Sequence, residues 1–268
     1  MSAAAPSITA NPFSLRGKVI LQFGGTGLLG RALVTALGDA GATLVVASRD
    51  RNAVAAVAEE ERARWADVQV DEVDIVSEPS LAALRDRTLA RHGRIDGLIF
   101  NAVVRPMKGF NGPLQGWADS MTTNATGFFA TVRMFGDAMA AAGRGSIVNI
   151  GSMMGSVGMN PWLYEDSGGV NPPPDYFFHK GGMLNLTRYL ASHYGRHGVR
   201  VNVVSPGGIY NPDQPQAPGF LARYAPMTML GRMADAAEIG GAVVFLLSDA
   251  ASYITGANLA VVGGYTAK

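Results

Sequence analysis

The chain has 268 residues, of which 48% are hydrophobic and 16% are charged, so it can bury the core of one large α/β domain or of two small ones. Its net charge of +1 argues against nucleic-acid and membrane-surface partners, and no apolar run approaches the length of a membrane span. There is no cysteine, and the four histidines lack metal-ligand spacing, so we expect no metal site and a cytoplasmic protein.

Residues 1–12 are small and polar, which predicts a flexible tail ahead of a single domain over 13–268. The apolar run 18–23 predicts a buried strand, and it leads directly into a glycine-rich turn and a helix over 31–37. Such a turn lets the backbone approach a pyrophosphate, while the helix N-terminus supplies donors. Strand, turn and helix therefore predict a dinucleotide site. Its expected contacts are Gly24, Thr26, Gly27, Leu28, Leu29 and Gly30.

A second apolar run, 43–47, predicts a strand that ends just before Ser48, Arg49 and Asp50. An NAD enzyme usually carries an acid at this strand tip, whereas an arginine there can pair with the 2′-phosphate of NADP. Ser48 and Arg49 therefore favour NADP(H) over NAD(H). A solvated Arg49, or an Arg49 paired with Asp50, is the alternative.

The rest of the chain alternates apolar strands with helices. Helices are expected over 52–66, 80–91 and 235–248 and around Tyr176, and strands over 68–74, 95–101, 146–150, 199–204 and 258–262. This βα spacing predicts an α/β fold: a single doubly wound Rossmann-type domain with a parallel sheet of about seven strands flanked by helices. Ligands bind at the carboxyl ends of such strands. The chemistry should therefore follow residues 23, 47, 74, 101, 151 and 204.

Tyr176 and Lys180 lie four residues apart, on one face of an expected helix. A phenol is a poor acid or base near neutral pH because its pKa is about 10, but a neighbouring ammonium lowers that pKa. The pair can therefore transfer a proton near pH 7. The spacing also occurs by chance, so the surrounding motifs decide its meaning. Asn124 and Gly127 interrupt another helical stretch and predict a disturbed helix with a free carbonyl.

Together these motifs resemble the short-chain dehydrogenase/reductase family, from about residue 13 to the end. The matching motifs are the glycine turn 24–30, Asp74, Asn101-Ala102, the set Asn124, Ser152, Tyr176 and Lys180, and Pro206-Gly207 with Asn211. The resemblance implies hydride transfer between a nicotinamide cofactor and a carbonyl or alcohol. It implies that Tyr176 exchanges the proton, that Ser152 holds the substrate oxygen, and that Lys180 lowers the tyrosine pKa and binds the nicotinamide ribose. Asn124 would anchor a water.

The resemblance also implies further cofactor contacts, at Asp74, Ile75, Asn101, Ala102, Tyr176, Lys180, Pro206, Gly207, Ile209 and Asn211. Four departures stand out, and one of them is Val262, which replaces an acid common just before the final Gly-Gly. Leu28 replaces a glycine of the common short form, and Phe100 and Val103 replace residues of the motif around Asn101. The separation of Ser152 from Tyr176 is about twice the family's usual one.

The extra residues between Ser152 and Tyr176 form a Pro-rich stretch, 155–175, which we expect to be a substrate lid. This arrangement is similar to a subgroup that acts on sugars and polyols. The expected substrate is a sugar, polyol or related polyhydroxylated molecule, including anionic ones. Its candidate contacts are Arg105, Met153, Met154, Trp162, Tyr164, Glu165 and Tyr210.

The family is usually oligomeric, and the apolar helix with Phe177 and Phe178 has more hydrophobic surface than one sheet face needs, so we expect a homotetramer. His179 is expected to be structural. Two other functions remain open at this point. One is a catalytically silent dinucleotide-binding regulator or scaffold, and the other is an isomerase or dehydratase that recycles the cofactor.

Overall fold

A computed structural model describes residues 11–62, 68–165 and 172–267 of the chain. Most of the expected tail and the centre of the expected lid, 166–171, lie outside the described residues. At the edge of the tail, the carbonyl of Pro12 accepts a hydrogen bond from the backbone nitrogen of Ala250.

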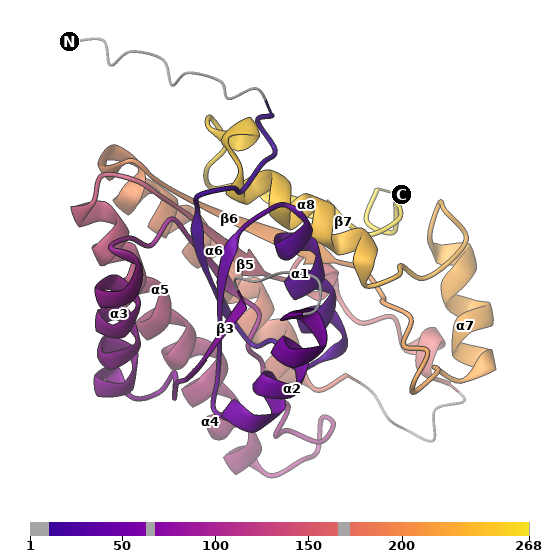
Figure 1. Cartoon of the computed structure of the whole chain (residues 1–268). Helices are drawn as coiled ribbons and strands as arrows, with labels where there is room; N and C mark the ends of the chain where they lie inside the picture. Colours follow the sequence, from indigo (N-terminus) through magenta and orange to yellow (C-terminus); the bar gives the residue numbers. More distant parts are fainter. Residues whose placement is uncertain (1–10, 63–67, 166–171, 268) are drawn as a thin grey trace.

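The centre of the molecule is a seven-stranded parallel sheet in the order β3-β2-β1-β4-β5-β6-β7, as the alternation of strands and helices predicts (Figure 1). Chain order runs outward from β1 to β3 and then returns to β4, which pairs with β1 on its other side. The strand order thus reverses between β1 and β4, and such a reversal opens a ligand crevice at the carboxyl ends of the strands. The strands are β1 (Val19–Phe23), β2 (Thr43–Ser48), β3 (Val68–Glu72), β4 (Gly97–Phe100), β5 (Gly145–Ile150), β6 (Val199–Pro206) and β7 (Asn258–Val261).

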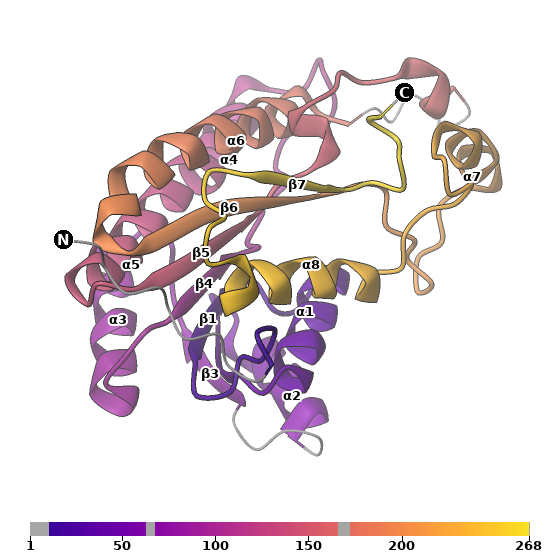
Figure 2. The same cartoon turned by 90° about the horizontal axis from the view of Figure 1, so that it is seen from above.

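Helices cover both faces of the sheet, with α4, α5 and α6 on one face and α1, α2 and α8 on the other, while α3 packs against α5 (Figure 2). The helices are α1 (Leu28–Asp39), α2 (Arg51–Arg62), α3 (Glu78–His92), α4 (Leu114–Met121), α5 (Phe128–Ala141), α6 (Pro174–Tyr194), α7 (Pro218–Tyr224) and α8 (Ala237–Leu247). Short turns complete the fold: the π-helical η1 (Thr122–Gly127) and the 3₁₀ segments η2 (Met153–Gly155), η3 (Pro161–Tyr164), η4 (Gly195–His197), η5 (Ala225–Met227) and η6 (Asp249–Ala251). None of the helices in the described ranges is long and apolar enough to cross a membrane.

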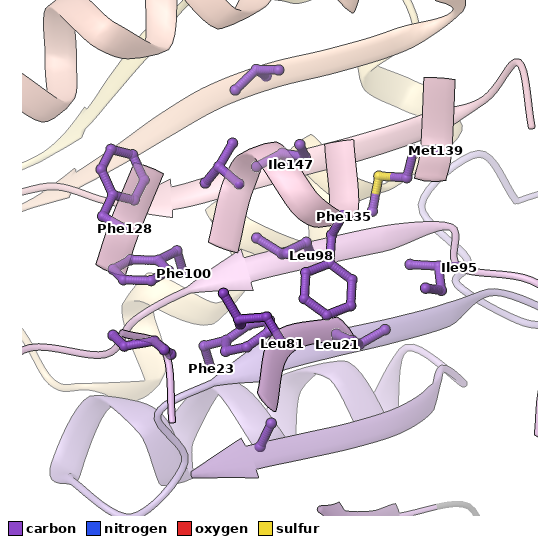
Figure 3. Close-up of a cluster of buried hydrophobic side chains, with 14 of the residues drawn as sticks. Leu21, Phe23, Leu81, Ile95, Leu98, Phe100, Phe128, Phe135, Met139 and Ile147 are labelled. Atoms are coloured by element: carbon purple, nitrogen blue, oxygen red, sulfur yellow. The ribbon is translucent and has the colours of Figure 1, made fainter. Parts of the chain in front are cut away.

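The central strands read as continuous apolar runs because both of their faces are covered. Four phenylalanines dominate the core under α5: the rings of Phe23 and Phe135 lie 5.3 Å apart, and those of Phe100 and Phe128 lie 4.9 Å apart (Figure 3). Burial of each such ring stabilises the fold by roughly 1.5–3 kcal/mol. Phe100, a departure from the family motif, is therefore a core residue that holds the end of β4 beside β1.

Helix α7 differs from the sequence expectation, which placed no helix between the strand over 199–204 and the helix over 235–248. It is only seven residues long, too short for a hydrophobic period to show. Pro218 stands in its first turn, where a proline favours helix initiation. In Figure 2 the helix stands apart from both layers. One packing partner is Tyr164, in the stretch between Ser152 and Tyr176, whose ring lies 5.6 Å from that of Phe220, and another is Tyr265, whose ring lies 5.5 Å from that of Tyr224.

Candidate active site

A cavity of about 1000 Å³ lies along the carboxyl ends of the strands, where the strand order reverses. Its lining comes from the residues after β1, β2, β3, β4, β5 and β6, and from α6, α7 and η3. Most of the expected cofactor contacts line it: Gly24, Thr26, Gly27, Leu28, Leu29, Gly30, Ser48, Arg49, Asp74, Ile75, Asn101, Ala102, Tyr176, Lys180, Pro206, Gly207 and Ile209. Asn211 does not line the cavity; its side-chain oxygen accepts a hydrogen bond from the backbone of Asp213.

The backbone of the turn between β1 and α1 packs closely against the residues that follow β4, and side-chain hydrogen bonds fix its conformation. Gly24 has a φ of 86°, and a Cβ added to it would lie 2.9 Å from the nitrogen of Ala102. The side-chain amide of Asn101 donates to the Gly24 carbonyl at 2.9 Å, and that of Gln22 donates to the Gly30 carbonyl at 2.8 Å.

Gly27 borders the cavity, and, apart from Gly27 itself and its two chain neighbours, no described residue has a heavy atom within 4 Å of where its Cβ would stand. Helix α1 begins at the next residue, Leu28, without a side-chain cap. Its first N–H groups and its positive dipole end are therefore available to an anion. Open space and a helix start at the end of a buried strand fit the pyrophosphate of a dinucleotide.

At the β2 end of the cavity, Arg49 is exposed and borders the space where a ribose would lie. Asp50 accepts a hydrogen bond from the backbone nitrogen of Ala53 at 3.0 Å and so caps the start of α2. Within the described part of the chain, no carboxylate forms an ion pair with Arg49. The alternative pairing of Arg49 with Asp50 therefore does not occur.

Tyr176 and Lys180 lie on one turn near the start of α6, and both border the cavity. The Lys180 nitrogen lies 5.8 Å from the centroid of the Tyr176 ring and donates to the carbonyl of Ile150 at 2.6 Å. Burial, with the positive charge of Arg105 as a second cause, lowers the pKa of Lys180 to about 7. The lysine is therefore poised to gain or lose its proton near neutrality.

Ser152 follows the end of β5 and is 7% exposed, with its hydroxyl oxygen accepting from the backbone of Met154 at 3.2 Å. It borders the same cavity as Tyr176, together with Met153 and Met154. A substrate oxygen placed between Ser152 and Tyr176 can receive two hydroxyl donors, which is the arrangement that stabilises a developing alkoxide.

Asn124 does not border the cavity, but its neighbour Thr123 does. The helix is disturbed here, as the sequence predicts, because the backbone adopts a π turn between α4 and α5. The Asn124 amide exchanges two 2.9 Å hydrogen bonds with the backbone of Val104 and donates a third to Ser120. Asn124 thereby ties this turn to the segment that follows β4, and π turns of this kind often mark functional sites.

His179 is buried behind the catalytic face, 4% exposed, with its ring 5.2 Å from that of Tyr176 in an edge-on contact. Burial, followed by the charges of Lys180 and Arg105, lowers the pKa of His179 to about 3. The imidazole therefore stays neutral at physiological pH and packs against the tyrosine, in line with a structural role.

The substrate end of the cavity has a wall that sequence reasoning missed. Phe220 and Tyr224 from α7, with Leu163 from η3 and Met233, border the cavity there. The Tyr224 hydroxyl accepts a 2.6 Å hydrogen bond from the backbone nitrogen of Gly208. A Cβ on Gly208 would lie 2.7 Å from the Tyr224 ring, so only glycine permits this contact.

Among the expected substrate contacts, Arg105, Met153, Met154 and Tyr164 border the cavity, whereas Trp162, Glu165 and Tyr210 do not. Trp162 is 45% exposed and Tyr210 is 40% exposed. Trp162 stands on η3, the 3₁₀ turn that carries Leu163 and Tyr164 to the cavity. Because Trp162 and Tyr164 are two residues apart on a helix with about three residues per turn, their side chains point in different directions, and only Tyr164 reaches the cavity.

Comparisons with known proteins agree with this site. A family model described as "Enoyl-(Acyl carrier protein) reductase" matches residues 27–266. The chain is 37% identical to cis-4-hydroxycyclohexanecarboxylate dehydrogenase of Sinomonas cyclohexanicum over 77% of this chain and 78% of that protein. It is 34% identical to galactitol 2-dehydrogenase of Rhizobium johnstonii over 95% of this chain and 97% of that protein.

Among solved structures, the fold is similar to a gluconate 5-dehydrogenase from Burkholderia cenocepacia, solved in complex with NADP and tartrate. The TM-score is 0.85 at 25% identity, over 96% of this chain and 98% of the other. The family model spans most of the chain and agrees with the order of motifs around the cavity. The chain therefore belongs to the short-chain dehydrogenase/reductase family and is an NAD(P)-dependent oxidoreductase.

Proposed function

We propose that the protein oxidises a secondary alcohol of a small polyhydroxylated molecule, or reduces the corresponding ketone, in the cavity beside Tyr176. The observation that carries this proposal is the convergence of Ser152, Tyr176 and Lys180 on the cavity that also holds the glycine turn. A silent regulator would need none of these hydroxyl and ammonium groups beside the cofactor space, so a regulatory or scaffolding role is not favoured.

In the proposed mechanism the bound nicotinamide supplies or accepts the hydride. Tyr176 gives its hydroxyl proton to the substrate oxygen during reduction and takes it back during oxidation. Ser152 holds that oxygen by a hydrogen bond, and Lys180, when charged, stabilises the phenolate and reaches toward the ribose. Asn124 keeps the π turn in place behind the lysine, where a water can connect Lys180 with solvent.

We propose NADP(H) as the favoured cofactor. Arg49 has no carboxylate partner within the described residues and stands at the tip of β2, where Ser48 replaces the acid expected for NAD. A guanidinium suits a phosphate because it offers several donors in a planar fork. Enzymes of this kind draw on the cell's nicotinamide pool, and we propose a cytoplasmic location on that ground.

The proposed substrate class is a sugar, polyol or related polyhydroxylated molecule, and the relative named for galactitol supports it. A second candidate is a hydroxylated ring. It is favoured by the apolar wall of Met153, Leu163, Phe220 and Met233, against which a ring can pack. The relative named for a hydroxycyclohexane acid is consistent with this candidate.

We also propose a homo-oligomer, with a tetramer as the expected state. Phe178 and Tyr189 on α6 are 60% and 63% exposed, and Phe129 on α5 is 37% exposed. Large apolar side chains on neighbouring helices of one face are typical of a surface that a second copy covers. Light scattering at micromolar concentration measures this directly, and a monomer would contradict it.

The experiment that tests the function is a panel of sugars, polyols, cyclic alcohols and simple ketones, each assayed with NADP(H) and NAD(H). We expect a stoichiometric absorbance change at 340 nm with at least one member of the panel. An isomerase or dehydratase would convert its substrate without net change at 340 nm, which product analysis of the same reactions would reveal. Absence of turnover with every alcohol and ketone would contradict the proposal.

A further inference from the structure

We propose that the substrate carries a carboxylate and that Arg105 binds it while the alcohol carbon lies between Ser152 and Tyr176. The protein would then be a hydroxy-acid dehydrogenase, which interconverts a hydroxy acid and the corresponding oxo acid. This inference rests on the proposed function and narrows it, because it names the chemical group that distinguishes a substrate from a neutral polyol.

The first observation is the position of Arg105. Its guanidinium carbon lies 5.3 Å from the centroid of the Tyr176 ring, and the residue borders the cavity. The arginine is also exposed, so its charge stays hydrated and available to a ligand. A guanidinium above the ring of Tyr176 lies near the position of the substrate oxygen that receives the tyrosine proton. A carboxylate elsewhere on the same small substrate can therefore reach it.

The second observation is the imbalance of charge around this end of the cavity. The charged residues that border the described cavity are Arg49, Asp74, Arg105 and Lys180. Arg49 and Asp74 follow β2 and β3, which lie at the opposite edge of the sheet from β6, the strand that α6 packs against. The only acid among the four is therefore remote from Tyr176. Among the described residues that border the cavity, the substrate end therefore has two basic groups and no acid.

These two cations act on each other. The charge of Arg105 is a cause, after burial, of the lowered pKa of Lys180 and contributes to the lowered pKa of His179. Like charges in a partly buried site raise the free energy of the charged forms, and an anion between them removes that penalty. A bound carboxylate would thus favour the protonated form of Lys180, which is the form that stabilises the Tyr176 phenolate.

The third observation is that, apart from its contact with the Tyr176 ring, the Arg105 guanidinium has no partner of opposite charge among the described residues. In the described ranges, neither a carboxylate nor a carbonyl pairs with its guanidinium, and its backbone is held separately. The Lys108 ammonium donates to the Arg105 carbonyl at 3.2 Å, and the Asn124 amide holds the neighbouring residue Val104 at 2.9 Å. The backbone before the arginine is fixed while its charged end remains open to a ligand, which is the arrangement expected of an anchoring group.

The reaction balances without a further component. In oxidation, the carbinol C–H bond breaks and its hydride passes to the oxidised nicotinamide, while the hydroxyl proton passes through Tyr176 to solvent. The carboxylate is unchanged and serves only to hold the molecule. The apolar wall of Met153, Leu163 and Phe220 would contact the carbon skeleton between the two oxygen-bearing ends.

Two matched substrate pairs test the inference: gluconate against glucitol, and cis-4-hydroxycyclohexanecarboxylate against its carboxamide. For the wild-type protein we expect kcat/KM to favour the acid of at least one pair by roughly 10- to 100-fold, the range of one charge-assisted hydrogen bond. Arg105→Gln should remove this preference, because kcat/KM for the acid should fall about tenfold or more further than kcat/KM for the neutral member. Arg196→Gln, the same change on the exposed turn η4 before β6, should keep the wild-type preference.

A binding measurement accompanies the kinetics. Cyclohexanecarboxylate, which has no alcohol to oxidise, should inhibit the wild-type enzyme competitively and inhibit Arg105→Gln at least tenfold more weakly. Cyclohexanecarboxamide should inhibit the two proteins equally. Unchanged thermal midpoints would show that the variant is folded.

Three results would overturn the inference. The first is that kcat/KM is equal for the acid and the neutral member in both pairs. The second is that Arg105→Gln lowers kcat/KM equally for the acid and the neutral member. The third is that the enzyme turns over simple ketones but neither of the two acids. In each of these cases hydride transfer still occurs and the proposed function survives. Only the absence of turnover with every alcohol and ketone would remove the proposed function as well.

Discussion

The side-chain nitrogen of Lys180 donates a 2.6 Å hydrogen bond to the carbonyl oxygen of Ile150, the last residue of β5. This bond joins the helix of Tyr176 to the strand end that leads into Ser152, so the proton donor and the oxygen-binding serine share one rigid frame. Lys180 is buried at this position, and burial lowers its pKa to about 7, with Arg105 as a second cause. Stability and activity should therefore both respond to the protonation of this residue.

The first prediction concerns stability. The pKa of Lys180 is about 7 in the folded chain and about 10.5 when unfolded, so between these values the unfolded chain binds more protons. The stability of the wild type should therefore rise with pH across this window. Lys180→Met removes the cost of the buried charge and should stabilise the protein by a few kcal/mol at pH 6, because a tenfold change in a protonation equilibrium corresponds to roughly 1.4 kcal/mol.

Urea unfolding at several pH values measures this difference. The advantage of Lys180→Met should be largest below pH 7 and shrink as the pH rises toward 10.5. Arg196→Gln, with its exposed side chain, should follow the wild type at every pH. A difference that does not change with pH would show that the folded pKa of Lys180 is ordinary.

The second prediction concerns Tyr224, whose hydroxyl holds the backbone of Gly208 beside the cofactor space. Tyr224→Phe leaves a buried N–H without its acceptor, which should cost about 1–3 kcal/mol of stability and weaken cofactor binding several-fold. Fluorescence titration with NADPH and urea unfolding measure the two effects. Tyr265→Phe is the matched control, because its hydroxyl contacts only the sulfur of Met227 at 3.8 Å among the described atoms. Equal behaviour of the two variants would contradict a positioning role for Tyr224.

The third prediction concerns cofactor choice. Arg49→Ala should lower kcat/KM with NADP(H) by roughly 10- to 100-fold, because a charge-assisted contact to the 2′-phosphate is lost. Activity with NAD(H), which lacks that phosphate, should hardly change and serves as the internal control. The idea fails if the wild-type enzyme prefers NAD(H).

The fourth prediction concerns the stretch between Ser152 and Tyr176 as a substrate lid. Tyr164 borders the cavity and packs on Phe220, whereas Trp162 does not border it and is largely exposed. Tyr164→Ala should therefore reduce kcat/KM for the best substrate selectively, with a small ketone less affected, while Trp162→Ala should have little effect on either. Equal losses on both substrates, or a loss that accompanies dissociation of subunits, would mean that the stretch has a structural role.

Much of the fold could be predicted because its signals are local. The buried strands are continuous apolar runs and the glycine turn stands between a strand and a helix, so alternation alone indicates the doubly wound sheet. Helix α7 could not be predicted, since seven residues in a Pro-rich region show no period. Its stability comes from tertiary contacts with Tyr164 and Tyr265, which are distant in the sequence.

The candidate site divides in the same way. The sequence predicts the roles of Gly24, Tyr176 and Lys180 from the spacing of their motifs. These three residues border one cavity. Phe220 and Tyr224 carry no such motif, and only the fold brings them there. The different placements of Trp162 and Tyr164, which are two residues apart, depend on the path of a 3₁₀ turn that their residue types do not determine.

The most direct test of the proposed chemistry is the turnover of Tyr176→Phe, which removes one hydroxyl and keeps the ring. Absorbance at 340 nm would be followed with the best alcohol of the panel, after NADPH titration has shown the same cofactor affinity as the wild type. We predict a loss of kcat on the order of 10²-fold or more, because a general acid–base group is lost. A variant that binds the cofactor and turns over at a near-normal rate would contradict the assignment of Tyr176 as the proton donor.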